Sequence, residues 1–232
     1  MRPLSLHSLR SFRFMMSAYK KGVTKNSNYV LSSDVLGKGS VMGKLKGNWS
    51  GASYEIYDSG VNPERGGGGA PRQELGVVFY EYDRMGPGKM KLAVPRPEAT
   101  NRFSGGKNGI VNILGEMADV DKLVMADMPE GLQKTLYVCQ NKRPRWDAEQ
   151  KGHVLNFKGR VTASSVKNFQ LQCEGASGEN TMLQFGRVNK NVFTLDYGYP
   201  LNAVQAFAVC ISSMDGKLAD SKGFDIVRKF SV

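Results

Sequence analysis

The sequence predicts a mainly β (α+β) fold, a closed antiparallel β-barrel around one buried helix. Short segments in which apolar and polar residues alternate recur along the chain, with Gly and Asn between them, and this pattern is typical of antiparallel strands. One later stretch, Pro200 to Asp215, is apolar on every side of a helical wheel, so a helix formed there has no face for water. A sheet that closes around this helix encloses it and leaves no exposed strand edges.

The start of the chain has two interpretations. Residues 1–14 contain Arg and Ser but no acidic residue, a composition typical of a mitochondrial transit peptide. We favour the alternative, an irregular or strand-forming start to the domain. After this segment the alternation predicts strands over residues 28–33, 41–45, 54–58 and 77–82.

A second group of strands follows a long interruption. Residues 84–108 are rich in Pro and Gly, so we expect a long excursion with at most short strands. Residues 110–136 have helical spacing and predict one or two peripheral helices, broken at Pro129. Strands then resume over residues 154–161, 169–173, 182–188 and 192–197, with no internal repeat or domain boundary visible.

The predicted central helix spans Pro200 to Asp215. Pro200 suits the first helical position, because its missing N–H is not needed there and its φ is already helical. At roughly 14 residues and ~1.5 Å per residue the helix is about 21 Å long, shorter than the ~30 Å hydrocarbon layer of a bilayer. We therefore interpret it as a core helix and not as a membrane span.

Positive charge is concentrated near the start of the chain. The 232 residues, enough to bury a sizeable core, carry a formal net charge of +11. Residues 1–50 contain nine Lys or Arg and a single acid, Asp34, a net charge of +8 that leaves +3 for the rest. Such a concentration indicates a polyanionic partner, either nucleic acid or an anionic membrane face, and the alternative is a solvated surface.

The cysteines and histidines argue against a metal site. Cys139, Cys173 and Cys210 are odd in number and widely spaced, so we expect reduced thiols and an intracellular compartment. His7 and His153 are the only histidines. Because no Cys or His cluster has metal-ligand spacing, we expect no structural zinc.

Enzymatic motifs are also lacking. Residues 37–44 superficially resemble a phosphate-binding loop, but the four-residue spacing before the Gly-Lys pair is missing and Leu45 stands where Ser or Thr is needed. His153 is the one credible general base, and no nucleophile motif accompanies it. We therefore expect no catalysis and no cofactor.

Several blocks of the sequence resemble the C-terminal domain of the tubby-like protein family. They are Ser27–Tyr29, Gly43–Lys46, Tyr57–Pro63, Arg72–Leu75, Asn141–Trp146, Asn156–Gln170, Gln184–Val188, Phe193–Leu201 and Ala206–Ala219. The match covers roughly residues 12 to 219. It implies a closed barrel of about twelve strands around a central hydrophobic helix, so we expect a barrel domain over residues 12–232 after an unstructured or atypical leader over residues 1–11.

The two ends depart from the family pattern. The family's domain usually opens with further strands before the segment that matches Phe12 to Ala18, and this chain begins almost at that point. Beyond Asp220 it continues to Val232, and Phe224–Phe230 is a candidate substitute strand. We expect the barrel to be either open or closed by these unusual ends.

Two lysines form a candidate anion site independently of the resemblance. Lys44 and Lys46 are two residues apart in a predicted strand, so both point to one face, ~6.6 Å apart. Since Val41 and Leu45 are expected to face the core, the two ammonium groups face solvent. Like charges held together are mildly unfavourable unless an anion bridges them. The alternative is a pair of edge lysines that discourage aggregation.

The resemblance implies that this anion is the headgroup of a phosphatidylinositol bisphosphate, bound on the outer surface of the barrel. The positions that match the family's site are Asn28, Lys44, Lys46 and Arg72. Lys46 stands where many members have Arg, so one bidentate phosphate contact is replaced by a point charge. Nearby, Lys20, Lys21 and Lys25 are expected to add nonspecific attraction to an anionic leaflet, ~1 kcal/mol per basic residue.

We therefore expect a noncatalytic, monomeric phosphoinositide-binding module, cytoplasmic and peripheral at the inner leaflet of the plasma membrane. Cilium and nucleus are alternative locations. The resemblance also implies trafficking of membrane-protein cargo to cilia. Longer members perform this role with a separate N-terminal segment, and in plants the N-terminal segment carries an F-box. We expect neither segment here, because the match begins so close to the first residue. The rival functions are a nucleic-acid-binding transcription regulator and a truncated barrel with little activity. The compact basic strand pair, without a basic recognition helix, favours the lipid.

Overall fold

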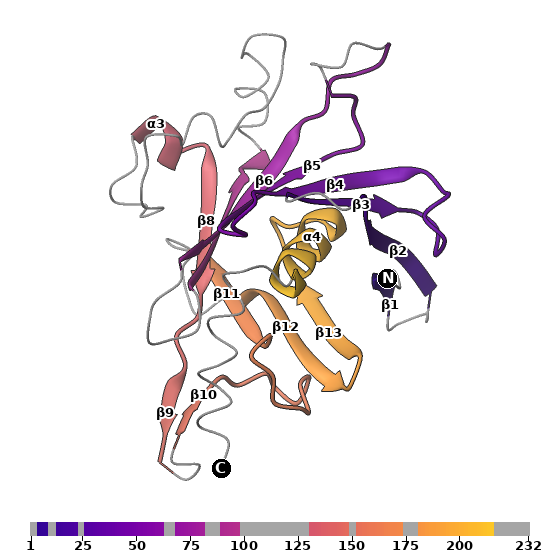
Figure 1. Ribbon diagram of the computed structural model, residues 1–232. Coiled ribbons are helices and arrows are strands. Elements are labelled where there is room, and N and C mark those ends of the chain that lie inside the picture. Colours follow the sequence, from indigo (N-terminus) through magenta and orange to yellow (C-terminus); the bar gives the residue numbers. More distant parts are fainter. Residues whose placement is uncertain are drawn as a thin grey trace.

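The computed structural model describes residues 4–8, 13–22, 26–62, 68–81, 89–97, 130–148, 152–173 and 181–215. Within these ranges the fold is mainly β, as expected (Figure 1). The strands are β1 (Leu4–Ser8), β2 (Arg13–Lys20), β3 (Ser27–Ser32), β4 (Val41–Gly47), β5 (Ser53–Tyr57), β6 (Glu74–Glu81), β7 (Lys89–Pro95), β8 (Leu136–Asn141), β9 (Arg145–Asp147), β10 (Gly152–Val154), β11 (Phe169–Cys173), β12 (Thr181–Asn189) and β13 (Val192–Tyr197). The helices are α3 (Glu130–Gln133) and α4 (Ala203–Met214).

Eleven of these strands form one antiparallel sheet in the order β1-β2-β3-β4-β5-β6-β7-β8-β11-β12-β13, while β9 and β10 pair separately. The sheet curves around α4, which lies between β4–β6 on one side and β11–β13 on the other (Figure 1). No hydrogen-bonded pairing joins the edge strands β1 and β13 within the described ranges. The closed barrel of about twelve strands is therefore not confirmed, although its antiparallel sheet is present.

Helix α4 is the central hydrophobic helix that the sequence predicts. Nine consecutive residues, from Gln205 to Ser213, are buried, and the helix packs against β4, β5, β6 and β13. Burial on every side follows from the absence of charge along this stretch, since no side chain requires water. Among the described residues, no helix combines the length and the apolar character needed to span a bilayer.

The first turn of α4 differs from the prediction. The helix begins at Ala203, and Pro200 lies before it in a cis peptide bond with Tyr199. Asn202 caps the helix, because its Oδ1 accepts the backbone N–H of Gln205 (2.9 Å) while Gln205 Oε1 accepts the N–H of Asn202 (2.8 Å). This capping box satisfies two backbone N–H groups, those of Asn202 and Gln205, that have no partner within the helix.

The last turn of α4 is tied to the sheet through one buried carboxylate. Asp215, only 6% exposed, accepts hydrogen bonds from Ser27 Oγ, Tyr29 Oη (2.9 Å), Tyr54 Oη (3.0 Å) and Lys20 Nζ (3.1 Å). Burial by itself raises the pKa of this carboxyl group, but these four donors stabilise the charged form and lower the pKa below its ordinary value. The end of the helix is thus anchored to β2, β3 and β5.

The start of the chain follows the favoured interpretation, and two later segments differ from the expected strands. Leu4–Ser8 forms a strand that pairs with β2, which agrees with the favoured strand-forming start, so this part of the expected leader over residues 1–11 is not unstructured. The Pro- and Gly-rich excursion contains β7, a strand of seven residues. The predicted strand 154–161 ends at Val154, because Lys158 (φ 50°) and Gly159 (φ 75°) adopt left-handed conformations in a turn.

The remaining expectations fall largely outside the described ranges. Of the predicted helices over 110–136, α3 lies just after Pro129, and residues 98–129 are outside the description. The candidate strand Phe224–Phe230 is also outside it.

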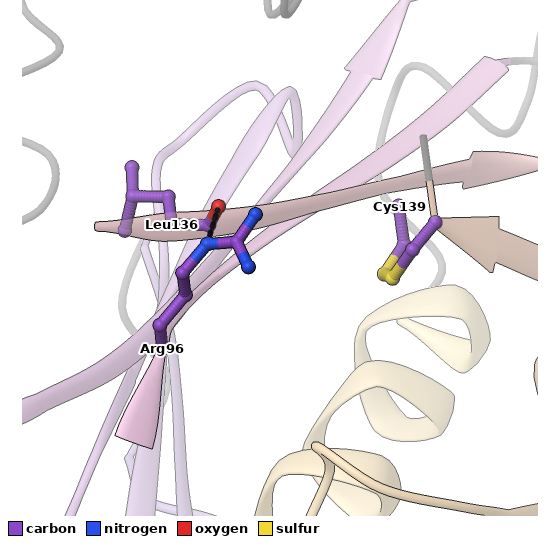
Figure 2. Close-up of a disulfide and its surroundings, with 4 residues drawn as sticks. Arg96, Leu136 and Cys139 are labelled. Carbon is purple, nitrogen blue, oxygen red and sulfur yellow. Dashed lines mark hydrogen bonds between the residues drawn. A yellow bond between two sulfur atoms is a disulfide. The ribbon is translucent and has the colours of Figure 1, made fainter. Parts of the chain in front are cut away.

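Two of the three cysteines are paired across the sheet. Cys139 on β8 lies directly opposite Cys173 on β11, and the two form a disulfide above α4 (Figure 2). The expectation of three reduced thiols is wrong for this pair, because strand register brings together residues that are 34 positions apart. The thiol of Cys210 is buried in α4, and this burial raises its pKa well above the ordinary value.

Candidate functional site

The register of three neighbouring strands brings the predicted site residues onto one surface. Asn28 on β3 lies directly opposite Lys46 on β4, and Lys44 lies opposite Tyr57 on β5. Leu45 between the two lysines is buried as expected, whereas Lys44 is half-buried and Lys46 is exposed. Both lysines therefore point to the outer face of the sheet. Val41, which was also expected to face the core, is 37% exposed, because the register shifts between Gly43 and Val41.

Arg72 reaches the same surface from the segment before β6. Its guanidinium carbon lies 4.1 Å from the centroid of the Tyr57 ring, a stacking contact. Tyr57 in turn lies beside Lys44 in the register. Asn28, Lys44, Lys46 and Arg72, which we call the β4 cluster, thus occupy one continuous outer surface over β3, β4 and β5.

A glycine holds two members of the cluster in place. Lys44 Nζ donates a hydrogen bond to the carbonyl oxygen of Gly60 (3.0 Å). A Cβ at Gly60 would lie 2.4 Å from Arg72 Cα and 2.5 Å from its backbone nitrogen. Asp58 Oδ1 accepts the backbone N–H groups of Gly60 (2.9 Å) and Gln73 (3.0 Å), which clamps the two segments together.

Replacing Gly60 by Ala is expected to lower the free energy of unfolding by about 1 to 3 kcal/mol, the usual cost of overpacking. The added methyl group meets backbone atoms of Arg72, which have no rotamer to move into. Urea unfolding followed by circular dichroism measures the change. Gly68→Ala is the matched control, because a Cβ at Gly68 meets no atom within 4 Å. Equal midpoints for the two variants contradict this account of Gly60.

An acidic residue lies within the cluster, and the sequence reasoning missed it. Glu55 on β5 is directly opposite Lys46, and its Oε2 lies 3.6 Å from Lys46 Nζ. The same oxygen accepts a hydrogen bond from Tyr57 Oη. The pKa of Tyr57 is raised well above its ordinary value, chiefly by burial and next by this hydrogen bond and the negative charge of Glu55. Tyr57 is therefore a neutral hydrogen-bond donor at pH 7. Glu55 is an internal competitor for any anion that approaches Lys46.

The residues expected to supply supporting charge are arranged differently. The ammonium group of Lys20 forms the ion pair with Asp215 and lies 5.6 Å from the Tyr29 ring centroid, so its charge is already compensated within the fold. Lys21 is exposed at the end of β2. Lys25 lies outside the described residues.

The chemistry available at this surface is electrostatic. Two ammonium groups, one guanidinium group and one amide provide donors for phosphate oxygens. Among the residues that the structure describes, no group of three His, Cys, Asp or Glu is placed to hold a metal ion. The side chain of His153, on β10, is not among those described.

Comparison with known proteins gives a consistent match over almost all of the chain. The sequence profile of the Tub family matches residues 4–216. Tubby-related protein 2 of Mus musculus is 40% identical over 215 residues, which cover 89% of this chain and 37% of the relative. Tubby protein homolog 1 of Caenorhabditis elegans is 36% identical over 217 residues, 89% of this chain and 49% of the relative. Tubby-related protein 3 of Homo sapiens is 35% identical, and this chain spans 47% of it. The chain thus spans less than half the length of these relatives.

Proposed function

Because this chain belongs to the Tub family, we propose that it is a noncatalytic module that binds a phosphatidylinositol bisphosphate headgroup and attaches reversibly to an anionic membrane surface. The observation that carries the proposal is the register of β3, β4 and β5, which brings together Asn28, Lys44 and Lys46, with Arg72 beside them. The resemblance implies a lipid-headgroup site at these same four positions. Family membership also supports, at the level of the family, a role in the trafficking of membrane proteins.

The donors of the β4 cluster suit a ligand with more than one phosphate group. Arg72 offers a planar fork for bidentate contact, while Lys44 and Lys46 act as point charges. Each hydrogen bond to a charged phosphate contributes about 1.5 to 3 kcal/mol before the costs of desolvation and immobilisation. Scattered basic residues near an anionic leaflet contribute only ~1 kcal/mol each. A clustered site therefore favours a bisphosphate over a singly charged lipid of the same surface density.

Flotation with vesicles tests the proposal directly. The native chain is mixed with vesicles that contain phosphatidylinositol bisphosphate or phosphatidylserine at matched surface charge. Soluble inositol trisphosphate, which is the free headgroup of this lipid, and single-stranded RNA are added as competitors. We expect about tenfold tighter binding to the bisphosphate vesicles, and displacement by the soluble headgroup. Equal binding to the two lipids would sink the proposal. Stronger binding to the RNA than to either vesicle would replace it with the nucleic-acid function.

Replacing Glu55 by Gln is expected to strengthen binding to the bisphosphate vesicles about threefold. The substitution removes a negative charge 3.6 Å from Lys46 Nζ. The pair is partly exposed, with Lys46 at 45% and Glu55 at 19%, and exposed pairs are worth about 0.2 to 1 kcal/mol. Vesicle titration measures the change. Glu81→Gln is the matched control, because Glu81 pairs with Lys91 (2.9 Å) outside the cluster and its loss changes the net charge equally. Equal gains in the two variants show that net charge, and not Glu55 as a competitor, sets the affinity.

A further inference from the structure

A large apolar side chain is exposed close to the β4 cluster. Trp49 lies in the turn between β4 and β5, three residues after Lys46, and it is 64% exposed. Three residues of chain span at most about 10 Å. The backbone of Trp49 therefore lies close to that of Lys46, at the end of β4. Since an aromatic ring of this size is usually buried against a partner, its exposure beside a proposed lipid site needs a physical explanation.

The turn that carries Trp49 is held by its own hydrogen bonds. Asn48 Oδ1 accepts the N–H of Ala52 (3.0 Å) and the hydroxyl of Ser50 (3.1 Å), and the N–H of Asn48 donates to Ser53 O (3.0 Å). Ala52 O accepts the N–H of Tyr80 on β6 (2.8 Å), which fixes the turn to the sheet. The backbone that carries the indole is therefore positioned relative to Lys46 before any partner binds, so little additional ordering is needed.

We propose that Trp49 is an interfacial anchor that enters the headgroup region of the same anionic bilayer whose lipid is held by Lys46. The inference rests on the proposed lipid function and adds a second contact to it. An indole combines an apolar ring with an N–H donor, and this combination favours the boundary between headgroups and acyl chains. The occupant follows from charge complementarity. The turn that carries Trp49 directly follows β4, whose outer face bears Lys44 and Lys46, and an anionic leaflet presents negative charge above an apolar layer.

The chain contains a matched control for this residue. Trp146 is the only other tryptophan, and at 61% its exposure is nearly the same. It lies on β9, in the separate two-stranded sheet that projects from the other strands (Figure 1). Trp49→Ser and Trp146→Ser therefore remove equal apolar surface from two places, only one of which is beside the β4 cluster.

Two binding measurements separate anchoring from headgroup recognition. Trp49→Ser is expected to lower the affinity for bisphosphate vesicles about tenfold, as partial burial of an indole predicts, and to leave the affinity for the soluble headgroup, inositol trisphosphate, unchanged. Trp146→Ser is expected to change neither. The proposal is overturned if Trp49→Ser binds the vesicles with native affinity, or if the two variants lose vesicle affinity equally. It is also overturned if Trp49→Ser loses affinity for the soluble headgroup. Circular dichroism checks that both variants fold.

Fluorescence tests the position of the indole directly. In a Trp146→Phe chain, Trp49 is the single tryptophan, and its emission is expected to shift to shorter wavelength with bisphosphate vesicles and to be quenched by brominated lipids. If the chain binds the soluble headgroup but the Trp49 emission does not shift with bisphosphate vesicles, the proposed role of Trp49 as an anchor is wrong and the proposed function is unaffected. Failure of the native chain to bind the soluble headgroup overturns the proposed function, and an emission shift with phosphatidylserine vesicles then identifies Trp49 as a contact to the bilayer by itself.

Discussion

The double substitution Lys44→Ala, Lys46→Ala is expected to lower the affinity for bisphosphate vesicles about 100-fold. The two side chains point outward from one strand, opposite Tyr57 and Asn28. Losing one charged hydrogen bond from each, at the lower end of about 1.5 to 3 kcal/mol, corresponds to this factor. The lower end is appropriate because Lys46 is 45% exposed and lies near Glu55. Vesicle flotation over a range of lipid concentrations measures the loss.

A second pair of lysines provides the control for net charge. Lys89 and Lys91 are also two residues apart on one strand, β7, and Lys91 pairs with Glu81 (2.9 Å). Lys89→Ala, Lys91→Ala removes the same charge as the first double substitution. We expect it to keep the preference for bisphosphate over phosphatidylserine. If both double variants lose that preference to the same degree, the attraction is diffuse and the β4 cluster is not a specific site.

Replacing Asp215 by Asn is expected to lower the free energy of unfolding by about 3 kcal/mol. Its carboxylate accepts hydrogen bonds from three buried hydroxyl groups, those of Ser27, Tyr29 and Tyr54, and from Lys20. An asparagine keeps one acceptor oxygen and turns two donor hydrogens toward these donors, so buried groups lose their partners. The ion pair with Lys20 contributes less to the free energy of unfolding than the buried hydroxyl groups do, because the Lys20 side chain is 26% exposed and solvent screens its charge. Urea unfolding measures the change.

Asp196 offers the matched comparison. It forms a bidentate pair with Arg160 (2.7 and 2.9 Å), but the two side chains are 38% and 39% exposed. Asp196→Asn is expected to cost less than about 1 kcal/mol, because solvent screens an exposed pair. If Asp215→Asn is no more destabilising than Asp196→Asn, the anchoring of α4 by a buried carboxylate is wrong.

The pH dependence of the same variants gives a further check on Asp215. The hydrogen bonds at this carboxyl group lower its pKa in the folded state despite its burial. Its contribution to stability is therefore present above the unfolded pKa of about 4 and is lost as the pH falls through the lower folded value. The difference in unfolding free energy between the native chain and Asp215→Asn should shrink between pH 5 and pH 2. A difference that stays constant over this range contradicts the assignment.

Local pattern predicted the parts of the fold that depend on one segment at a time. An alternating strand assigns each side chain to one face, which is why Lys44 and Lys46 were expected on the outer surface with Leu45 inside. An uncharged stretch apolar on every side predicted the enclosed helix. Where a local conformation interrupted the pattern, the prediction failed. The expected strand 154–161 stops at Val154, and left-handed residues form a turn at 158–159. The cap at Asn202 begins the helix later than Pro200.

The sequence by itself determined the β class, the central helix, the outward lysines and, through several separate motifs, the resemblance to one family. Only the tertiary structure decided which side chains meet: Glu55 with Lys46, Arg72 with Tyr57, Lys20 with Asp215, and Cys139 with Cys173. The physical reason is that a period of two residues assigns a face but not a partner. Partners follow from the register of hydrogen bonds between strands and from the packing of α4 against them, and these form only when the distant segments come together.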